Sequence, residues 1–126
     1  MRTLWRGFDD VGVDLAYAAA DLVVFPSSWE GFGIPPVEAA LHRRPTIVGS
    51  YPVAAEFRAK GFDWPFPGDV DRLRSLLRDD VARARLVERN FRVAERHFTQ
   101  AALTRSLGRL LAERDWMPPT AQRFRA

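Results

Sequence analysis

Two carboxylates and two glycines lie close together in the first third of the chain, within the run from Pro26 to Glu38, Pro-Ser-Ser-Trp-Glu-Gly-Phe-Gly-Ile-Pro-Pro-Val-Glu. Gly31 and Gly33 allow the backbone to pass close to a ligand. The run follows a short apolar segment and leads into a helix that two prolines open. Open α/β sheets bind their ligands at such carboxyl ends of strands. The free N–H groups of a first helical turn suit a phosphate.

The acids of this run indicate what else the ligand carries. Proline has no N–H to give, so the usable donors are expected at Gly33, Ile34 and Val37. Glu30 and Glu38 would be repelled by phosphate, and they are expected to accept hydrogen bonds from sugar or ribose hydroxyls. This chemistry predicts a nucleotide-sugar or phospho-sugar site. The alternative interpretation is a helix start that nearby acids merely stabilise.

The elements that must position this run alternate between strands and helices. Strands are expected at 3–8, 22–25 and 46–48, and helices at 13–20, 35–43, 52–60, after a cap at Asp69, at 82–97 and after a cap at Thr99. Such alternation predicts an α/β fold, a partial Rossmann-like parallel sheet with flanking helices and a helical C-terminal tail. Three or four strands are few for a doubly wound domain, so further strands are expected upstream.

Composition narrows the class of protein. The chain is 47% hydrophobic and 28% charged, as in soluble globular domains. It has no cysteine and two histidines, which excludes thiolate catalysis and argues against a metal site. The absence of cysteine is compatible with the cytosol. We see neither a signal peptide nor an apolar run of about 18 residues.

Charge is distributed unevenly along the chain. Residues 1–68 hold 6 basic and 8 acidic side chains, whereas residues 69–126 hold 13 basic and 8 acidic ones. Two interpretations stay open for the basic part: a solvated arginine-rich face, or a surface that meets anionic lipid or a partner domain. The arginines are interleaved with acids rather than clustered, which argues against nucleic acid as a partner.

The motif run and its flanks resemble the signature of family 4, or group 1, glycosyltransferases. The matching segments are Tyr17-Ala-Ala-Ala-Asp-Leu-Val-Val-Phe-Pro-Ser, Glu30-Gly-Phe-Gly-Ile-Pro-Pro-Val-Glu38-Ala and Arg44-Pro-Thr-Ile-Val. Glu30 and Glu38 match the E-x7-E hallmark of that family. Glu56 and Pro67-Gly68-Asp69 extend the resemblance, which covers about residues 3–115.

The resemblance implies the GT-B fold, two Rossmann-like domains that face a cleft. Residues 1–115 would be the C-terminal domain, which binds the nucleotide-sugar and is incomplete at its N-terminal side, and residues 116–126 a flexible tail. The resemblance further implies retaining transfer of a hexose of the mannose or glucose type, without a metal or other cofactor.

The resemblance also assigns roles to single residues. The residue that matches Glu30 contacts the donor sugar and is the catalytic candidate, and the residue that matches Glu38 holds the ribose hydroxyls. The remaining candidates meet the sugar and the diphosphate, mainly through their backbone: Ser28, Gly31, Phe32, Gly33, Ile34 and Val37.

Departures from the family pattern shape the expected function. Arg43 stands where the family usually has glycine, so its turn is expected either to take a left-handed residue at some cost or to adopt another shape. The loop at 50–55 lacks the usual glycines and carries Tyr51 and Pro52 instead. The family's diphosphate-clamping arginine and lysine and its N-terminal acceptor domain have no counterpart here, and Arg58 and Lys60 lie on the wrong side of the motif by sequence order.

The chain is therefore expected to be a fragment, a split subunit or a degenerate product that is inactive alone. A separate chain would supply the acceptor domain, and the location would be cytoplasmic, at the inner face of the membrane. Two alternatives remain: a non-catalytic nucleotide-sugar-binding subunit, and a membrane-associated module that uses the basic helices after residue 69.

Overall fold

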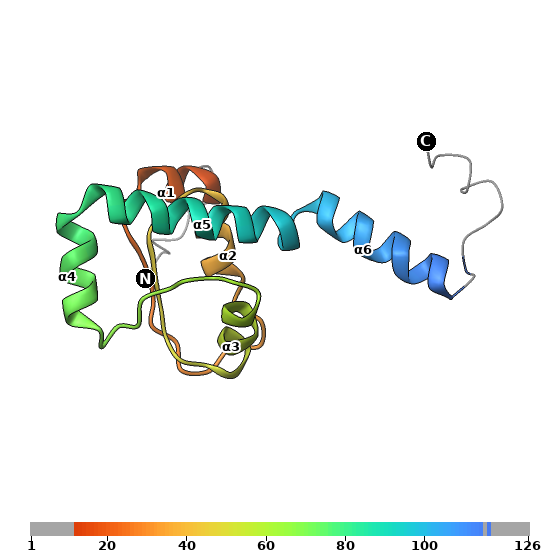
Figure 1. The fold of residues 1–126 in the computed structure, drawn as a ribbon, viewed down its shortest axis with the longest axis horizontal. Helices are drawn as coiled ribbons and strands as arrows, with labels where there is room; N and C mark the ends of the chain where they lie inside the picture. The colour runs from red at the N-terminus through yellow and green to blue at the C-terminus, as the bar shows by residue number, and fades with distance from the viewer. Residues whose placement is uncertain (1–11, 115, 117–126) are drawn as a thin grey trace, which may run out of the picture. The chain divides into compact units, whose positions relative to one another are not determined.

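The computed structural model describes residues 12–114 and 116, in two compact units that divide between Ala94 and Glu95 (Figure 1). The elements in chain order are α1 Val13–Ala19, β1 Val23–Phe25, α2 Ile34–Leu41, β2 Thr46–Val48, α3 Pro52–Ala59, α4 Val70–Arg78, α5 Asp80–Phe98 and α6 Gln100–Glu113. They confirm the predicted α/β fold. The strand expected at 3–8, and all of the tail except Trp116, lie outside the described residues.

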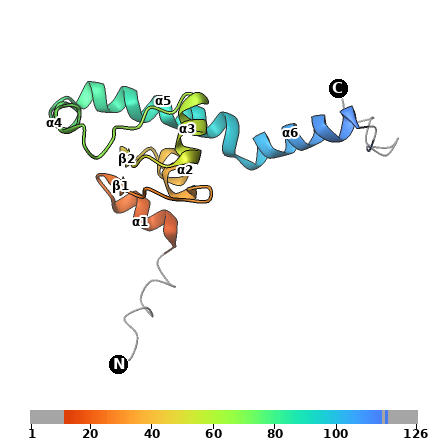
Figure 2. The same cartoon turned by 90° about the horizontal axis from the view of Figure 1, so that it is seen from below.

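The two described strands pair in parallel, with Val23 opposite Thr46 and Phe25 opposite Val48. The helix that joins them, α2, packs against both. Figure 2 shows α1 on one side of the strands and α4 and α5 on the other. Parallel strands end at the same edge of a sheet. The loops that follow β1 and β2 therefore lie together at one edge, as the motif requires.

The core of the first unit is aromatic. Trp64 and Phe57 are fully buried, and their rings meet edge to face with centroids 5.8 Å apart. Phe62 stacks on Trp64 at 4.3 Å. The irregular segment that carries Phe62 and Trp64 is joined to β2, because the Val48 N–H donates to the Pro65 carbonyl at 3.0 Å. Burial of aromatic surface holds this segment in place although it forms no helix or strand.

Polar contacts fix the remaining elements. The Asn90 side chain on α5 is 2% exposed, donates to the Asp63 carbonyl at 2.9 Å and accepts from the Asp63 N–H at 2.8 Å. Asp69 caps α4 as predicted, by accepting from the Arg72 N–H at 3.3 Å. In the second unit Thr99 caps α6, again as predicted. These side chains satisfy backbone groups that helix ends and irregular segments leave unpaired.

The turn after α2 confirms the strain expected at Arg43. Its backbone is left-handed, with φ of 53°. A residue with a Cβ adopts this conformation at a cost of about 1–2 kcal/mol. The guanidinium lies 3.5 Å over the ring of Phe91 and its Nε is 3.4 Å from a carboxylate oxygen of Glu88. Both contacts offset the strain and join the turn to α5.

Candidate functional site at the carboxyl edge of the strands

The loops after β1 and β2 are in backbone contact. The Gly49 N–H donates to the Phe25 carbonyl at 2.8 Å. A Cβ at Gly49 would collide with the carbonyl oxygen of Ser27 and approach the Pro26 carbonyl carbon to 2.8 Å. Only glycine fits at position 49, and the motif loop therefore has a fixed base on the second strand.

The start of α2 has no side-chain cap, and it is exposed at Ile34 but buried at Gly33. Gly33 is its N-cap, with φ of 81°, and no side chain caps the helix. Pro35 and Pro36 occupy the first turn, so the N–H groups of Gly33 and Ile34 are the donors at this end. Ile34 is 55% exposed. Val37, the third predicted donor, has its side chain in the core, 5% exposed. The structure places the predicted phosphate donors at the carboxyl edge of the strands.

Glu38 is oriented by a tyrosine from α1. The Tyr17 hydroxyl donates to Glu38 Oε2 at 2.9 Å, and its oxygen lies 3.3 Å from the Pro35 carbonyl oxygen. Burial first, and then the hydrogen bond to Glu38, raise the pKa of Tyr17 to about 12. The phenol is therefore neutral and donates. Among the described residues Glu38 Oε1 has no protein partner, so this oxygen can accept from a ligand hydroxyl.

The catalytic candidate Glu30 lies in the loop that leads into α2, half-buried and without a hydrogen bond or ion pair among residues 12–114. The charge of Glu30 acts on the hydroxyl of Tyr51. Burial, and next the negative charge of Glu30, raise the pKa of the Tyr51 hydroxyl, whereas Arg58 lowers it. That hydroxyl is buried and has no hydrogen-bond partner among the described residues. A buried unpaired hydroxyl is unusual in a folded protein.

The other predicted contact residues line the open side of this loop. Ser28 and Gly31 are exposed, and Phe32 is 49% exposed. Phe32 also meets the buried Phe57 ring edge-on at 5.1 Å, which ties the loop to α3. Trp29, next to Glu30, is 80% exposed. The structure thus brings the predicted site residues to one edge, with the exception of the Val37 side chain.

Comparison with known proteins decides the family. The family model described as glycosyl transferases group 1 matches residues 2–93. The chain belongs to the group 1 glycosyltransferases. The matched range includes both strands and both acids of the motif.

Two curated relatives resemble this group 1 transferase chain. One is the O-antigen chain mannosyltransferase RfbU of Salmonella typhimurium, 37% identical over 65 residues, which are 52% of this chain and 18% of that protein. The other is the mannosylglucosylglycerate synthase of Thermotoga maritima, 29% identical over 113 residues, 74% of this chain and 26% of that protein. The chain thus spans about a quarter or less of these relatives. No solved structure matches.

Three residues that were not predicted as site residues also lie at the carboxyl edge of the strands in this group 1 chain. Tyr17 orients Glu38, and Tyr51 lies beneath the start of α2. Arg58 reaches back to the carboxyl end of β2, where it donates to the carbonyls of Val48 at 3.5 Å and Trp64 at 2.6 Å. Burial lowers the pKa of Arg58, opposed by Asp63. The position of Tyr17 on the helix before the motif was a signal that could have predicted its role. The sequence spacing gave no such signal for Tyr51 or Arg58.

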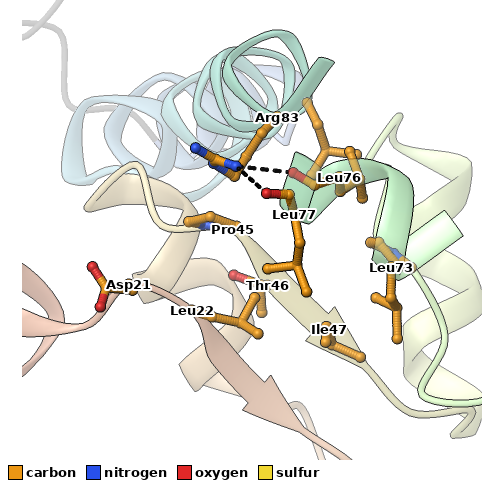
Figure 3. Close-up of a pocket in the computed structure, with 11 residues that line it drawn as sticks. Asp21, Leu22, Pro45, Thr46, Ile47, Leu73, Leu76, Leu77 and Arg83 are labelled. Carbon is orange, nitrogen blue, oxygen red and sulfur yellow. Dashed lines mark hydrogen bonds between the residues drawn. The ribbon is translucent and has the colours of Figure 1, made fainter. Parts of the chain in front are cut away.

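A cavity of about 340 Å³ lies elsewhere, at the amino ends of the strands (Figure 3). Its lining is mostly apolar and comes from segments around both strands and from α4 and α5: Leu22, Ile47, Leu73, Leu76, Leu77 and Leu86. Arg83 at the cavity donates to the carbonyls of Leu76 and Leu77. No predicted site residue lines the cavity, whose charged lining residues are Asp21 and Arg83. The carboxyl edge therefore remains the candidate site.

Two further findings concern metals and membranes. Within the part of the chain that the structure describes, no group of three or more histidine, cysteine, aspartate or glutamate side chains lies in position to hold a metal ion. In the same residues, none of the helices combines the length and the apolar character that crossing a membrane needs.

Proposed function

We propose that this chain is the nucleotide-sugar-binding, C-terminal domain of a family 4 retaining glycosyltransferase with the GT-B fold. One observation carries the proposal: in a group 1 chain, the uncapped start of α2 and the two acids of the motif lie at the carboxyl edge of a parallel strand pair. Such an edge is where α/β sheets bind nucleotides. The helix start suits phosphate, and the acids suit hydroxyl groups.

Each residue has a separate role in the proposed complex. The N–H groups of Gly33 and Ile34 donate to the diphosphate, together with the partial positive charge of the helix end. Glu38 accepts from the ribose hydroxyls through Oε1, since Tyr17 occupies Oε2. Glu30 accepts from the sugar and acts at the transferred group.

The transferred sugar is proposed to be a hexose of the mannose type. One of the two relatives is named a mannosyltransferase and the other a mannosylglucosylglycerate synthase. Transfer with retention of the anomeric configuration, and diphosphate binding without a metal, follow the family resemblance. Because the matched parts are only 18% and 26% of the relatives, activity of the whole protein needs an acceptor domain, in the cytoplasm and at the membrane face.

The test is a titration of the purified chain with UDP, GDP, ADP and their hexose conjugates. Trp29 is exposed beside Glu30, so tryptophan fluorescence reports binding directly. Glu38→Gln keeps an oxygen for the Tyr17 hydroxyl but removes the charge, and we expect about tenfold weaker binding of the preferred nucleotide. Glu95→Gln, an exposed acid on α5, is the matched control and leaves affinity unchanged.

A deoxyribose analogue sharpens the assignment. If Glu38 accepts from ribose hydroxyls, loss of a hydroxyl weakens binding to the wild-type chain and has no further effect on Glu38→Gln. Additive losses would reject the ribose role while leaving nucleotide binding in place. Absence of binding at millimolar nucleotide by a folded wild-type chain would reject the proposed function for this chain.

A second candidate function is nucleotide-sugar binding without turnover. The observation that favours it concerns Arg58, whose guanidinium at the carboxyl end of β2 already donates to two backbone carbonyls. Binding without hexose transfer, measured for the chain together with an acceptor domain, would support this candidate over the enzyme.

A further inference from the structure

The starting observation is the side chain of Tyr51, which follows β2 and is the N-cap of α3. It is 4% exposed, and its hydroxyl has no hydrogen-bond partner among the described residues. The ring is held in place by an edge contact with Phe25, with centroids 6.0 Å apart. Burial of an unpaired hydroxyl is unfavourable, so a second state in which it is paired has a free-energy advantage.

The hydroxyl lies directly beneath the helix start that the ligand is proposed to use. A Cβ added at Gly33 would collide with the Tyr51 hydroxyl oxygen and lie 3.0 Å from its Cζ. Gly33 is the N-cap of α2 and one of the two N–H donors of the site. The Tyr51 hydroxyl and the Gly33 N–H therefore belong to the same small region.

The surroundings fix what the hydroxyl can bind. Burial and the charge of Glu30 hold the Tyr51 phenol in its neutral form, so it carries a proton to donate. Its preferred partner is an oxygen acceptor, and an anionic acceptor makes the stronger bond. The charge of Glu30 acts on the same hydroxyl more strongly than the opposing positive charge of Arg58, so an anion here is favoured by the start of α2 rather than by these two side chains.

We propose that Tyr51 is a further ligand-binding residue of the site, whose hydroxyl donates a hydrogen bond to a phosphate oxygen of a nucleoside diphosphate bound at the start of α2. This inference rests on the proposed function. The hydroxyl is covered by the chain at Gly33, so the proposed contact requires the backbone at Gly33 to move away from it.

The loop at 50–55 is one of the places where the sequence departs from the glycine-rich pattern of the family it resembles, and Tyr51 is the large side chain that stands there. A phenol donor beside the helix start would supply a contact to phosphate from the loop that follows β2.

Tyr51→Phe separates this role from a structural one, because the two predict opposite signs. In the free chain the hydroxyl has no partner, so its removal leaves the midpoint of urea unfolding unchanged or raises it. In the complex the removal breaks a bond to an anion, so the nucleoside diphosphate that binds the wild-type chain best among UDP, GDP and ADP binds about tenfold more weakly. Tyr17→Phe, which loses a hydroxyl that is paired in the free chain, should lower the unfolding midpoint.

NMR of the wild-type chain tests the same inference without relying on the folding of the Tyr51→Phe variant. The chain has two tyrosines, so wild-type protein labelled with ¹³C at the tyrosine Cζ gives two signals, and Tyr17→Phe assigns them. We expect the Tyr51 signal to shift on saturation with the nucleoside diphosphate. Equal affinity of wild type and Tyr51→Phe, or an unmoved Tyr51 signal at saturation, overturns the inference alone. Absence of nucleotide binding by the folded wild-type chain overturns it together with the proposed function.

Discussion

The starts of α2 and α4 differ in whether a side chain caps the helix. Both helices follow loops that contain proline and glycine, and both leave N–H groups unpaired at their first turn. At α4 the Asp69 carboxylate accepts from the Arg72 N–H, so the protein closes the helix end itself. At α2 no side chain caps the helix and Gly33 takes a left-handed conformation. The start of α4 is therefore capped by a side chain, whereas the start of α2 is not and is the end at which we propose that a ligand binds.

The acids near the two helices show the same difference. Asp63, in the segment before α4, is held by Arg72 Nη2 at 2.5 Å and lies 3.8 Å from Arg89 Nη1. Glu30, before α2, has no ion pair among residues 12–114. We therefore expect substitutions around the start of α4 to change the stability of the chain alone, and substitutions around the start of α2 to change ligand binding. The following changes test this, from the largest effect to the smallest.

Gly49→Ala should be the most damaging change. Its Cβ collides with the Ser27 carbonyl, a backbone atom that cannot rotate away, so we expect a loss of about 3 kcal/mol in the free energy of unfolding and loss of nucleotide binding. Urea unfolding and the nucleotide titration measure the two effects. Gly68→Ala is the control, because its Cβ meets nothing within 4 Å. A Gly49→Ala chain as stable as this control would contradict the contact between the loops.

Asn90→Ala should lower the free energy of unfolding by about 2 kcal/mol, because it leaves the part-buried N–H and carbonyl of Asp63 without their partner. Chemical denaturation gives the value. Arg92→Ala, which breaks only an exposed ion pair with Glu88, should cost less than about 1 kcal/mol. Nucleotide affinity of the folded Asn90→Ala chain should match the wild type; a selective loss of affinity would break the separation between the two sides.

Asp69→Ala should cost about 1 kcal/mol, since it removes the cap of α4 and leaves the Arg72 N–H without that acceptor. Asp69→Asn keeps a capping oxygen and should retain most of the stability. Thermal and urea unfolding of the three chains measure the difference. Nucleotide affinity should not change in either variant, and a change would indicate that this helix end also meets ligand.

The smallest effect is a pH dependence at Tyr17. Its pKa is raised in the folded chain from 10.0 to about 12. Its contribution to stability is therefore complete below pH 10, where the unfolded chain also holds the proton, and is lost as the pH rises from 10 through about 12. The difference in unfolding free energy between wild type and Tyr17→Phe should shrink over that interval. A difference that stays constant across it would rule out the raised pKa.

The fold was largely predictable because short periodic signals decide it. The apolar runs at 22–25 and 46–48 and the caps at Asp69 and Thr99 depend on neighbours in the sequence, and the structure confirms each within one or two residues. Of the two shapes expected for the turn at Arg43, the left-handed one is present. The division between Ala94 and Glu95 falls inside α5, where the helical pattern continues without a signal.

The site was predictable only in part. Glu30, Glu38 and the glycines are close in sequence, so a single motif predicts them as site residues. The Tyr17 hydroxyl donates to Glu38, which is 21 residues away in the sequence. The Tyr51 hydroxyl lies beside Gly33, although Tyr51 comes from the loop after β2. Such contacts depend on packing between elements, which periodicity and propensity do not specify. Arg58 was set aside by its position in the sequence, whereas its guanidinium lies at the carboxyl end of β2.

The turn at Arg43 has a consequence for how related chains vary. Here a strained arginine is compensated by the Phe91 ring and by Glu88, 45 residues along the chain from it. A glycine at position 43 would relax the backbone and give up both contacts. The two solutions are alternatives, so an aromatic residue at position 91 should accompany a cation at position 43 and become dispensable where glycine stands. We therefore expect the residues at positions 43 and 91 to covary among related chains.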